Sequence, residues 1–197
     1  MALSPFKTVQ LEASDEASVV EAARQLEGVP IDLLINNAGI YIADDLHSAK
    51  KQDFLRQFEV NAVGPFLVTR ALLPNLNLAA KSHGTATVAQ VSSFLGSLGG
   101  NTIENEQFFG HSYAYSMSKA ALNMVTRSLS VGLRDSNIVF VTLNPGYVDT
   151  DMNDHNGYLP PAESAESMAN IVANLSMKDT GKFYNADKQF GEFELPW

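Results

Sequence analysis

The chain has 197 residues, of which 45% are hydrophobic and 18% charged, the balance of one globular domain with a sizeable core. Its net charge of −9 argues against nucleic acid and an anionic membrane as partners, because both bind basic surfaces. The absence of cysteine excludes disulfides, thiolate catalysis and cysteine metal sites. Since no signal peptide or membrane-spanning apolar run is found, we expect a cytoplasmic protein.

The first third of the sequence predicts two strands with a helix between them. The first strand is short and covers Thr8–Glu12. Asp15 and Glu16 suit the first turn of the helix that follows, because acidic side chains stabilise a helix N-terminus. The second strand, Asp32–Asn36, is apolar and runs into the amides and the glycine of residues 36–39.

A long helix and a third strand come next. The helix is expected from about Ala49 to Leu73, where Pro74 would stop it. Asn61 falls in its middle, and because asparagine is a poor helix former, its presence there suggests a functional role. The third strand, Ala86–Ser92, is rich in β-branched residues and ends in two hydroxyls.

The second half of the chain alternates helices and strands. In chain order, the expected elements are a helix from about Tyr113 to Arg134, a strand over 138–145, a helix near Ala162–Leu175 and a strand that includes Lys182–Asn185. The loop over 98–112 is either a wall of a substrate site or an ordinary surface loop. The alternation predicts an α/β fold with a doubly wound, Rossmann-like parallel sheet, in a single domain over residues 1–197.

Polar or turn residues follow three of the predicted strands at the point where each strand ends. They are Asn36-Asn37, Ser92-Ser93 and Pro145-Gly146. In open parallel sheets, ligands bind outside the carboxyl ends of the strands. The sequence therefore predicts a ligand site at this edge of the sheet.

Tyr115 and Lys119 are four residues apart on a predicted helix, which puts them on one face, a turn apart. Free tyrosine titrates near pH ~10 and is a poor base at neutral pH. A partly buried ammonium at about 4 Å can supply the ~4 kcal/mol that moves a phenol toward pH 7. The pair therefore predicts a tyrosine that exchanges a proton with an alcohol or carbonyl oxygen. Tyr113 lacks such a lysine.

The ordered motifs resemble those of the short-chain dehydrogenase/reductase family, and most closely its C-factor and sniffer-type carbonyl reductase-like members. The matching pieces are Asn36-Asn37-Ala38-Gly39, Asn61 in 59–64, Val91-Ser92-Ser93, Tyr115-x3-Lys119 and the segment 145–150. The resemblance covers essentially the whole chain, and it implies an NAD- or NADP-dependent oxidoreductase acting on a small-molecule carbonyl or alcohol.

The family likeness also implies roles for single residues. The catalytic set is Asn61, Ser93, Tyr115 and Lys119, with Ser93 preferred over Ser92 for polarising the substrate carbonyl. In the family, Asn61 would hold a water that relays protons to the lysine. The cofactor-binding set is Asn37, Ala38, Gly39, Lys119, Pro145, Gly146, Val148 and Thr150. The four histidines (His47, His83, His111, His155) form no metal-ligand spacing, so no metal site is expected.

The front of the chain departs from the family pattern. No G-x-x-x-G-x-G or G-x-G-x-x-G run occurs, and residues 1–14 resemble the family's third strand. We therefore expect a Rossmann-like domain truncated at its N-terminus, with weak binding of NAD or NADP, because backbone donors for the pyrophosphate are missing. Three readings stay open: an active oxidoreductase, a catalytically silent interaction or regulatory protein, and a truncated product of a full-length reductase.

The truncation leaves the Asp32–Asn36 strand without a partner on one side, which is costly for an apolar strand. We expect either that the Thr8–Glu12 strand pairs beside it or that another subunit covers it. By family analogy, the helices at about 49–73 and 113–134 form a second surface for a homodimer.

Overall fold

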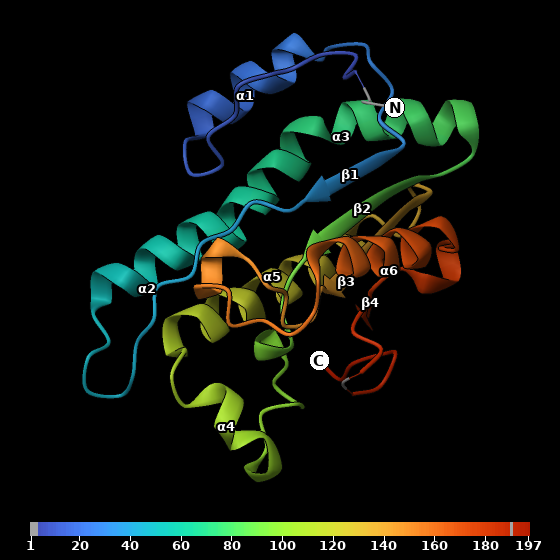
Figure 1. Cartoon of the computed structure of the whole chain (residues 1–197). Coiled ribbons are helices and arrows are strands. Elements are labelled where there is room, and N and C mark those ends of the chain that lie inside the picture. The colour runs from blue at the N-terminus through green and yellow to red at the C-terminus, as the bar shows by residue number, and fades with distance from the viewer. Residues whose placement is uncertain (1–3, 190) are drawn as a thin grey trace.

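The computed structural model describes residues 4–189 and 191–197, and its centre is a four-stranded parallel sheet (Figure 1). The strands are β1 (Leu33–Asn36), β2 (Ala86–Val91), β3 (Ile138–Asn144) and β4 (Lys182–Asn185), hydrogen-bonded in the order β1-β2-β3-β4. Each neighbouring pair is parallel, with Leu33 opposite Thr87 and Val141 opposite Lys182. The expected parallel α/β fold is confirmed.

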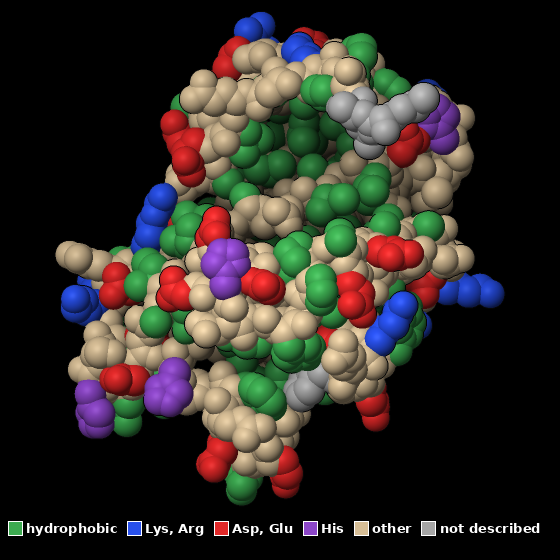
Figure 2. Space-filling view, viewed as in Figure 1, with side chains coloured by type: hydrophobic (Ala, Val, Ile, Leu, Met, Phe, Trp, Pro, Cys, Tyr) green, Lys and Arg blue, Asp and Glu red, His purple; other side chains and the backbone are tan. Residues whose placement is uncertain are grey.

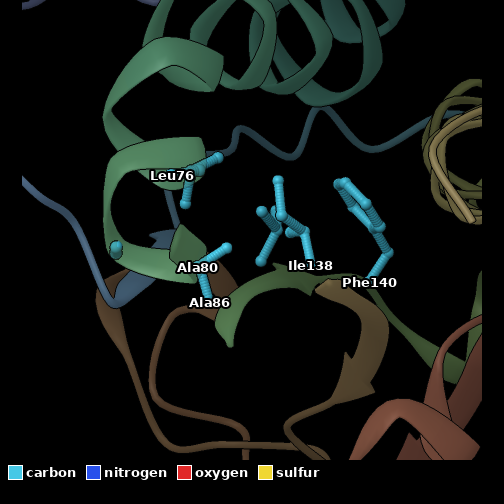
Figure 3. Close-up of a cluster of buried hydrophobic side chains, with 7 residues drawn as sticks. Leu76, Ala80, Ala86, Ile138 and Phe140 are labelled. Atoms are coloured by element: carbon cyan, nitrogen blue, oxygen red, sulfur yellow. The ribbon is translucent and has the colours of Figure 1, made fainter. Parts of the chain in front are cut away.

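Helices cover both faces of the sheet, as a doubly wound fold requires. α3 (Gly64–His83) and α5 (Tyr113–Gly132) lie on one face, and α6 (Pro161–Ala173) lies on the other. Figure 3 shows how Leu76 and Ala80 of α3 meet Ala86 of β2 and Ile138 and Phe140 of β3. This core fixes the strand ends that carry the polar residues.

The segment before β2 is longer and more irregular than the sequence indicated. α2 (Lys51–Phe58) passes through a π-helical turn (Glu59–Val63) into α3, which runs past Pro74 to His83. The expectation that Pro74 ends the helix is wrong. Buried Leu72, Leu76 and Ala79 hold α3 against the rest of the molecule on both sides of the proline, which offsets the lost backbone hydrogen bond.

The prediction of a strand at Thr8–Glu12 is also wrong. These residues form no strand, and the Asp15 amide bonds Glu12 O at 3.0 Å, which turns the chain into α1 (Glu16–Gln25). α1 packs on α3 rather than on the sheet. β1 is therefore the outer strand of the described sheet, with Leu33 40% and Ile35 52% exposed. Figure 2 shows a hollow lined with hydrophobic side chains in this part of the molecule, below α1.

The opposite edge of the sheet is covered by the end of the chain. The Asn185 amide donates to Phe193 O, and the Leu195 amide donates to Phe183 O, each at 2.8 Å. An antiparallel bridge between Tyr184 and Glu194 joins the same two segments. Across the residues that the structure describes, no helix has the length and apolar character to cross a membrane.

Candidate active site

Asn61 lies in the π-helical turn and is fully buried. Its side-chain Oδ1 accepts a hydrogen bond from the Ile40 amide at 2.8 Å, and its Nδ2 donates to Ile40 O and Ser118 Oγ, both at 2.9 Å. Gln57, one turn earlier, pairs in the same way with the amide and carbonyl of Ile42, at 3.0 and 3.2 Å. Two side-chain amides therefore hold the segment after β1 beside the start of α5.

Gly39 belongs to this held segment and lies next to the catalytic candidates. A Cβ atom at Gly39 would lie 3.2 Å from Asn61 Oδ1 and 3.5 Å from Lys119 Nζ. The absence of a side chain at Gly39 thus keeps the space beside the Lys119 ammonium free. Asn37 and Ala38, also predicted to contact the cofactor, are exposed next to it.

Lys119 points inward from α5 and is only 4% exposed. Its Nζ donates to Val91 O at 2.9 Å, at the carboxyl end of β2, and lies 5.6 Å from the centre of the Tyr115 ring. Burial lowers the pKa of the Lys119 ammonium to about 8. An ammonium has three N–H donors, so Lys119 retains donors for a ligand beyond the one given to Val91.

Tyr115 precedes Lys119 by one turn and packs edge-on against Tyr41, with ring centres 5.2 Å apart. Burial raises the pKa of Tyr115 to about 12, a hydrogen bond from the Ser93 hydroxyl opposes this rise, and Tyr41 adds to it. The expectation that Lys119 lowers the Tyr115 pKa is wrong as a net effect, because burial outweighs it and Lys119, with a pKa of about 8, has lost its charge before Tyr115 titrates. Burial disfavours the charged form of both groups, and the phenol is neutral at pH 7.

The two neighbouring serines at the end of β2 have different partners. Ser92 is buried, and its Oγ donates to Asn123 Oδ1 at 2.7 Å inside the protein. Ser93 is less buried and reaches Tyr115. Of these two hydroxyls, the one beside Tyr115 is that of Ser93, the serine that the family likeness favours for polarising the carbonyl.

The loop after β3 carries the other cofactor candidates. Gly146 has φ +88°, and a Cβ there would lie 2.9 Å from Asp187 and from Leu159, so only glycine fits. Ser164 Oγ donates to Pro145 O at 2.7 Å. Val148 and Thr150 are held within the loop itself, since Asn153 Nδ2 donates to Val148 O and the Asn153 amide donates to Thr150 O.

Asp44 and Tyr41 are two contributors that the sequence analysis missed. Asp44 is 6% exposed, and its carboxylate oxygens accept hydrogen bonds from the Tyr113 and Ala114 amides at 2.6 and 2.9 Å. It thus caps the N-terminus of α5 directly before Tyr115. Capping residues usually stand next to their helix in sequence, whereas Asp44 is 69 residues away from Tyr113, so no local pattern could identify it.

No group of three or more His, Cys, Asp or Glu side chains suited to a metal ion occurs in the described part of the chain. The nearest arrangement is His155, whose ring nitrogens lie 2.6 Å from Asp149 Oδ1 and 2.9 Å from Asp151 Oδ1. The two carboxylates raise the pKa of this exposed imidazole.

Comparisons with known proteins find relatives of this chain in sequence and in structure. The sequence profile of the short chain dehydrogenase family matches residues 3–157. The C-signal of Myxococcus xanthus is 40% identical over 85% of this chain and 93% of its own length. The NADPH-bound carbonyl reductase from chicken fatty liver is 35% identical with a TM-score of 0.84, over 96% of this chain and 76% of that one.

The carbonyl reductase Sniffer of D. melanogaster is 31% identical, with a TM-score of 0.85 over 96% of this chain and 77% of that one. The resemblance to C-factor and sniffer-type members is confirmed. The fold, the motif order and these similarities lead to one conclusion: the chain belongs to the short-chain dehydrogenase family of oxidoreductases.

Proposed function

We propose that the chain transfers hydride between a nicotinamide cofactor and a small carbonyl or alcohol substrate, with Tyr115 as the general acid or base. The observation that carries the proposal is the convergence of Ser93, Tyr115, Lys119 and Asn61 from β2, α5 and the π-helical turn. A surface Tyr-Lys pair would need none of these partners.

The arrangement suits carbonyl reduction at neutral pH. A bound nicotinamide cofactor would supply hydride to the carbonyl carbon, and the neutral Tyr115 phenol would donate a proton to the carbonyl oxygen. Ser93 donates a hydrogen bond to the same oxygen and stabilises the negative charge that develops there. The Lys119 ammonium, protonated below its pKa of about 8, stabilises the phenolate that remains.

The residues present fit the nicotinamide and ribose half of the cofactor. Gly39 leaves room beside Lys119, whose spare N–H donors suit ribose hydroxyls. Val148 and Thr150 would contact the nicotinamide carboxamide, just after the strand end at Pro145 and Gly146. Asn37 and Ala38 would line the adenosine side. The likeness to the NADPH-bound chicken reductase supports this assignment.

This sequence does not contain the glycine-rich turn that usually binds the phosphate half of a dinucleotide. Charge-assisted hydrogen bonds are worth roughly 1.5–3 kcal/mol each, so losing two weakens binding by about two to four decades. We expect the 197-residue chain to bind NADH or NADPH at best near millimolar, measured by calorimetry with both nucleotides. Low-micromolar affinity would mean that another segment supplies the phosphate donors.

The assay that tests the function is carbonyl reduction at saturating NADH or NADPH, followed by the loss of absorbance of the reduced nicotinamide. Turnover that disappears on removal of the carbonyl substrate supports the proposal. No turnover with a panel of reactive aldehydes and ketones, under conditions where calorimetry shows the cofactor bound, contradicts it and favours an interaction role.

A homodimer is the expected assembly. The first candidate interface is the outer strand β1, where Ile35 is exposed. The second is a stripe of exposed residues at intervals of seven on α5, formed by Met117, Met124 and Val131. We expect analytical ultracentrifugation to find a dimer that Ile35→Lys dissociates. Leu98→Glu, at a 77% exposed loop position, is the matched control.

If Met124→Glu dissociates the dimer and Ile35→Lys does not, the helical face is the interface. A wild-type chain that stays monomeric at high concentration would contradict both candidate dimer interfaces.

A further inference from the structure

The Ser93 hydroxyl lies on a short turn that its two neighbours in sequence hold in place. Ser93 caps the 3-10 turn Phe94–Gly96, and its Oγ accepts a hydrogen bond from the Leu95 amide at 3.2 Å. Before it, the Ser92 amide donates to Leu143 O at 2.8 Å. After it, the Phe94 amide donates to Asn144 Oδ1 at 3.0 Å. The end of β3 therefore holds both residues that flank Ser93.

Of these two anchors, the one before Ser93 is an ordinary backbone bond of the β2–β3 pair, which any sequence would form. The one after it depends on a side chain. Asn144 is 3% exposed and stands at the last position of β3, opposite Asn185 of β4. Its identity therefore determines whether the Phe94 amide has an acceptor at this position.

The Asn144 amide can face only one way. The Asp187 amide, which can only donate, lies 3.1 Å from Asn185 Oδ1, so that atom of Asn185 is the acceptor oxygen. Asn144 Nδ2 donates to the same oxygen at 2.8 Å. The nitrogen of Asn144 is thereby committed, and its oxygen must face the Phe94 N–H.

We propose that Asn144 is a positioning residue for Ser93: it fixes the place of the Ser93 hydroxyl through the Phe94 amide, and Asn185 sets the orientation of Asn144. The kinetic side of this inference rests on the proposed function. Because Ser93 reaches Tyr115, a shift of the turn moves the carbonyl-polarising hydroxyl away from the proton donor.

Asn75 provides a matched control within the same protein. It is also 3% exposed, and its Nδ2 donates to Leu26 O at 2.6 Å and Val29 O at 2.8 Å, where α3 meets the end of α1. Removing either amide leaves buried backbone groups without a partner, so both variants lose stability. Only Asn144 contacts the turn that carries Ser93.

The kinetic test is a double-mutant cycle between Asn144→Ala and Ser93→Ala. Asn144→Ala is expected to lower kcat by roughly tenfold to a hundredfold with Ser93 present, and by less than about twofold in the Ser93→Ala background. Asn75→Ala should leave kcat unchanged. Asn144→Asp keeps an acceptor for the Phe94 amide, so it should retain most of the kcat while losing stability. An equal loss in both Ser93 backgrounds would overturn the inference.

A structural readout decides the inference independently of turnover. Crystal structures of the full chain should show Ser93 Oγ displaced in Asn144→Ala and unmoved in Asn75→Ala. Amide hydrogen exchange at Phe94 should accelerate in the first variant only. If the wild-type chain is inactive, the proposed function is wrong, but the structural comparison of the two variants still tests the positioning role. If Ser93 does not move and the Phe94 exchange rate is unchanged in Asn144→Ala, the positioning role is overturned. If Asn144→Ala does not fold, Asn185→Ala provides the same comparison.

Discussion

Tyr115→Phe is expected to lower kcat for carbonyl reduction by roughly 10²–10⁴-fold, the usual contribution of a positioned general acid. The change removes only the phenolic hydroxyl, which is the proton donor beside Ser93. The ring keeps its edge-on contact with Tyr41, so the thermal unfolding midpoint should change little. Steady-state kinetics with a reactive carbonyl, together with a melting curve, measures both effects.

Tyr113→Phe is the matched control for this experiment. Tyr113 lies two residues earlier on the same helix, its side chain is 39% exposed, and its contact with Asp44 uses the backbone amide, which the substitution keeps. Its kcat should stay at the wild-type value. If Tyr115→Phe retained most of the activity, Tyr115 could not be the proton donor.

Lys119→Met is expected to raise stability while lowering activity. Burial lowers the Lys119 pKa from its ordinary 10.5 to about 8, so below pH 8 the folded state holds a buried charge that the unfolded state hydrates freely. That difference corresponds to about 3 kcal/mol. Removing the charge abolishes this penalty and also the charge-assisted hydrogen bond to Val91 O, worth about 2 kcal/mol. The expected net gain at pH 7 is therefore about 1 kcal/mol.

The pH dependence has a definite sign. Between pH 8 and 10.5 the unfolded chain binds more protons at Lys119 than the folded chain does, so wild-type stability gains from this residue as pH rises. The advantage of Lys119→Met should shrink over that window. Urea denaturation at pH 7 and near pH 10 measures it, with the exposed Lys178→Met as control. A Lys119→Met chain less stable than wild type at pH 7 would contradict the argument.

The same residue predicts the pH profile of the reaction. In the proposed role, the ammonium stabilises the Tyr115 phenolate, so reduction in the wild-type chain should slow as pH rises through about 8. Lys119→Met should be slow throughout and lack this step. The buried Lys119 ammonium is thus expected to lower the stability of the fold and to raise the activity of the site.

Local patterns were enough to predict most of the architecture. The predicted strands over 32–36, 86–92 and 138–145 are short apolar runs with polar ends, and each lies within a residue or two of its observed bounds. Tyr115 and Lys119 could be paired because helix periodicity alone puts them on one face. The three strands and the Tyr115–Lys119 pair could therefore be predicted from residues that are close together in the sequence.

What could not be predicted depends on distant contacts. The Thr8–Glu12 segment has the composition of a strand, but a strand exists only where a partner accepts its hydrogen bonds. Pro74 stays helical because packing on both sides outweighs one lost bond. The Tyr115 pKa depends on how deeply the ring is buried, which spacing does not reveal.

The two amides that hold Ile40 and Ile42 have a geometric consequence. Gln57 and Asn61 are four residues apart on a helix, which advances about 6 Å over that interval, and alternate residues of an extended chain repeat at about 6.6 Å. The side-chain amides of Gln57 and Asn61 therefore hydrogen-bond the backbone of Ile40 and Ile42 much as the peptide groups of an adjacent strand would. Because each residue of a helix turns by about 100°, deleting one residue between Gln57 and Asn61 would rotate Gln57 out of this match and release Ile42, which follows Tyr41 in sequence.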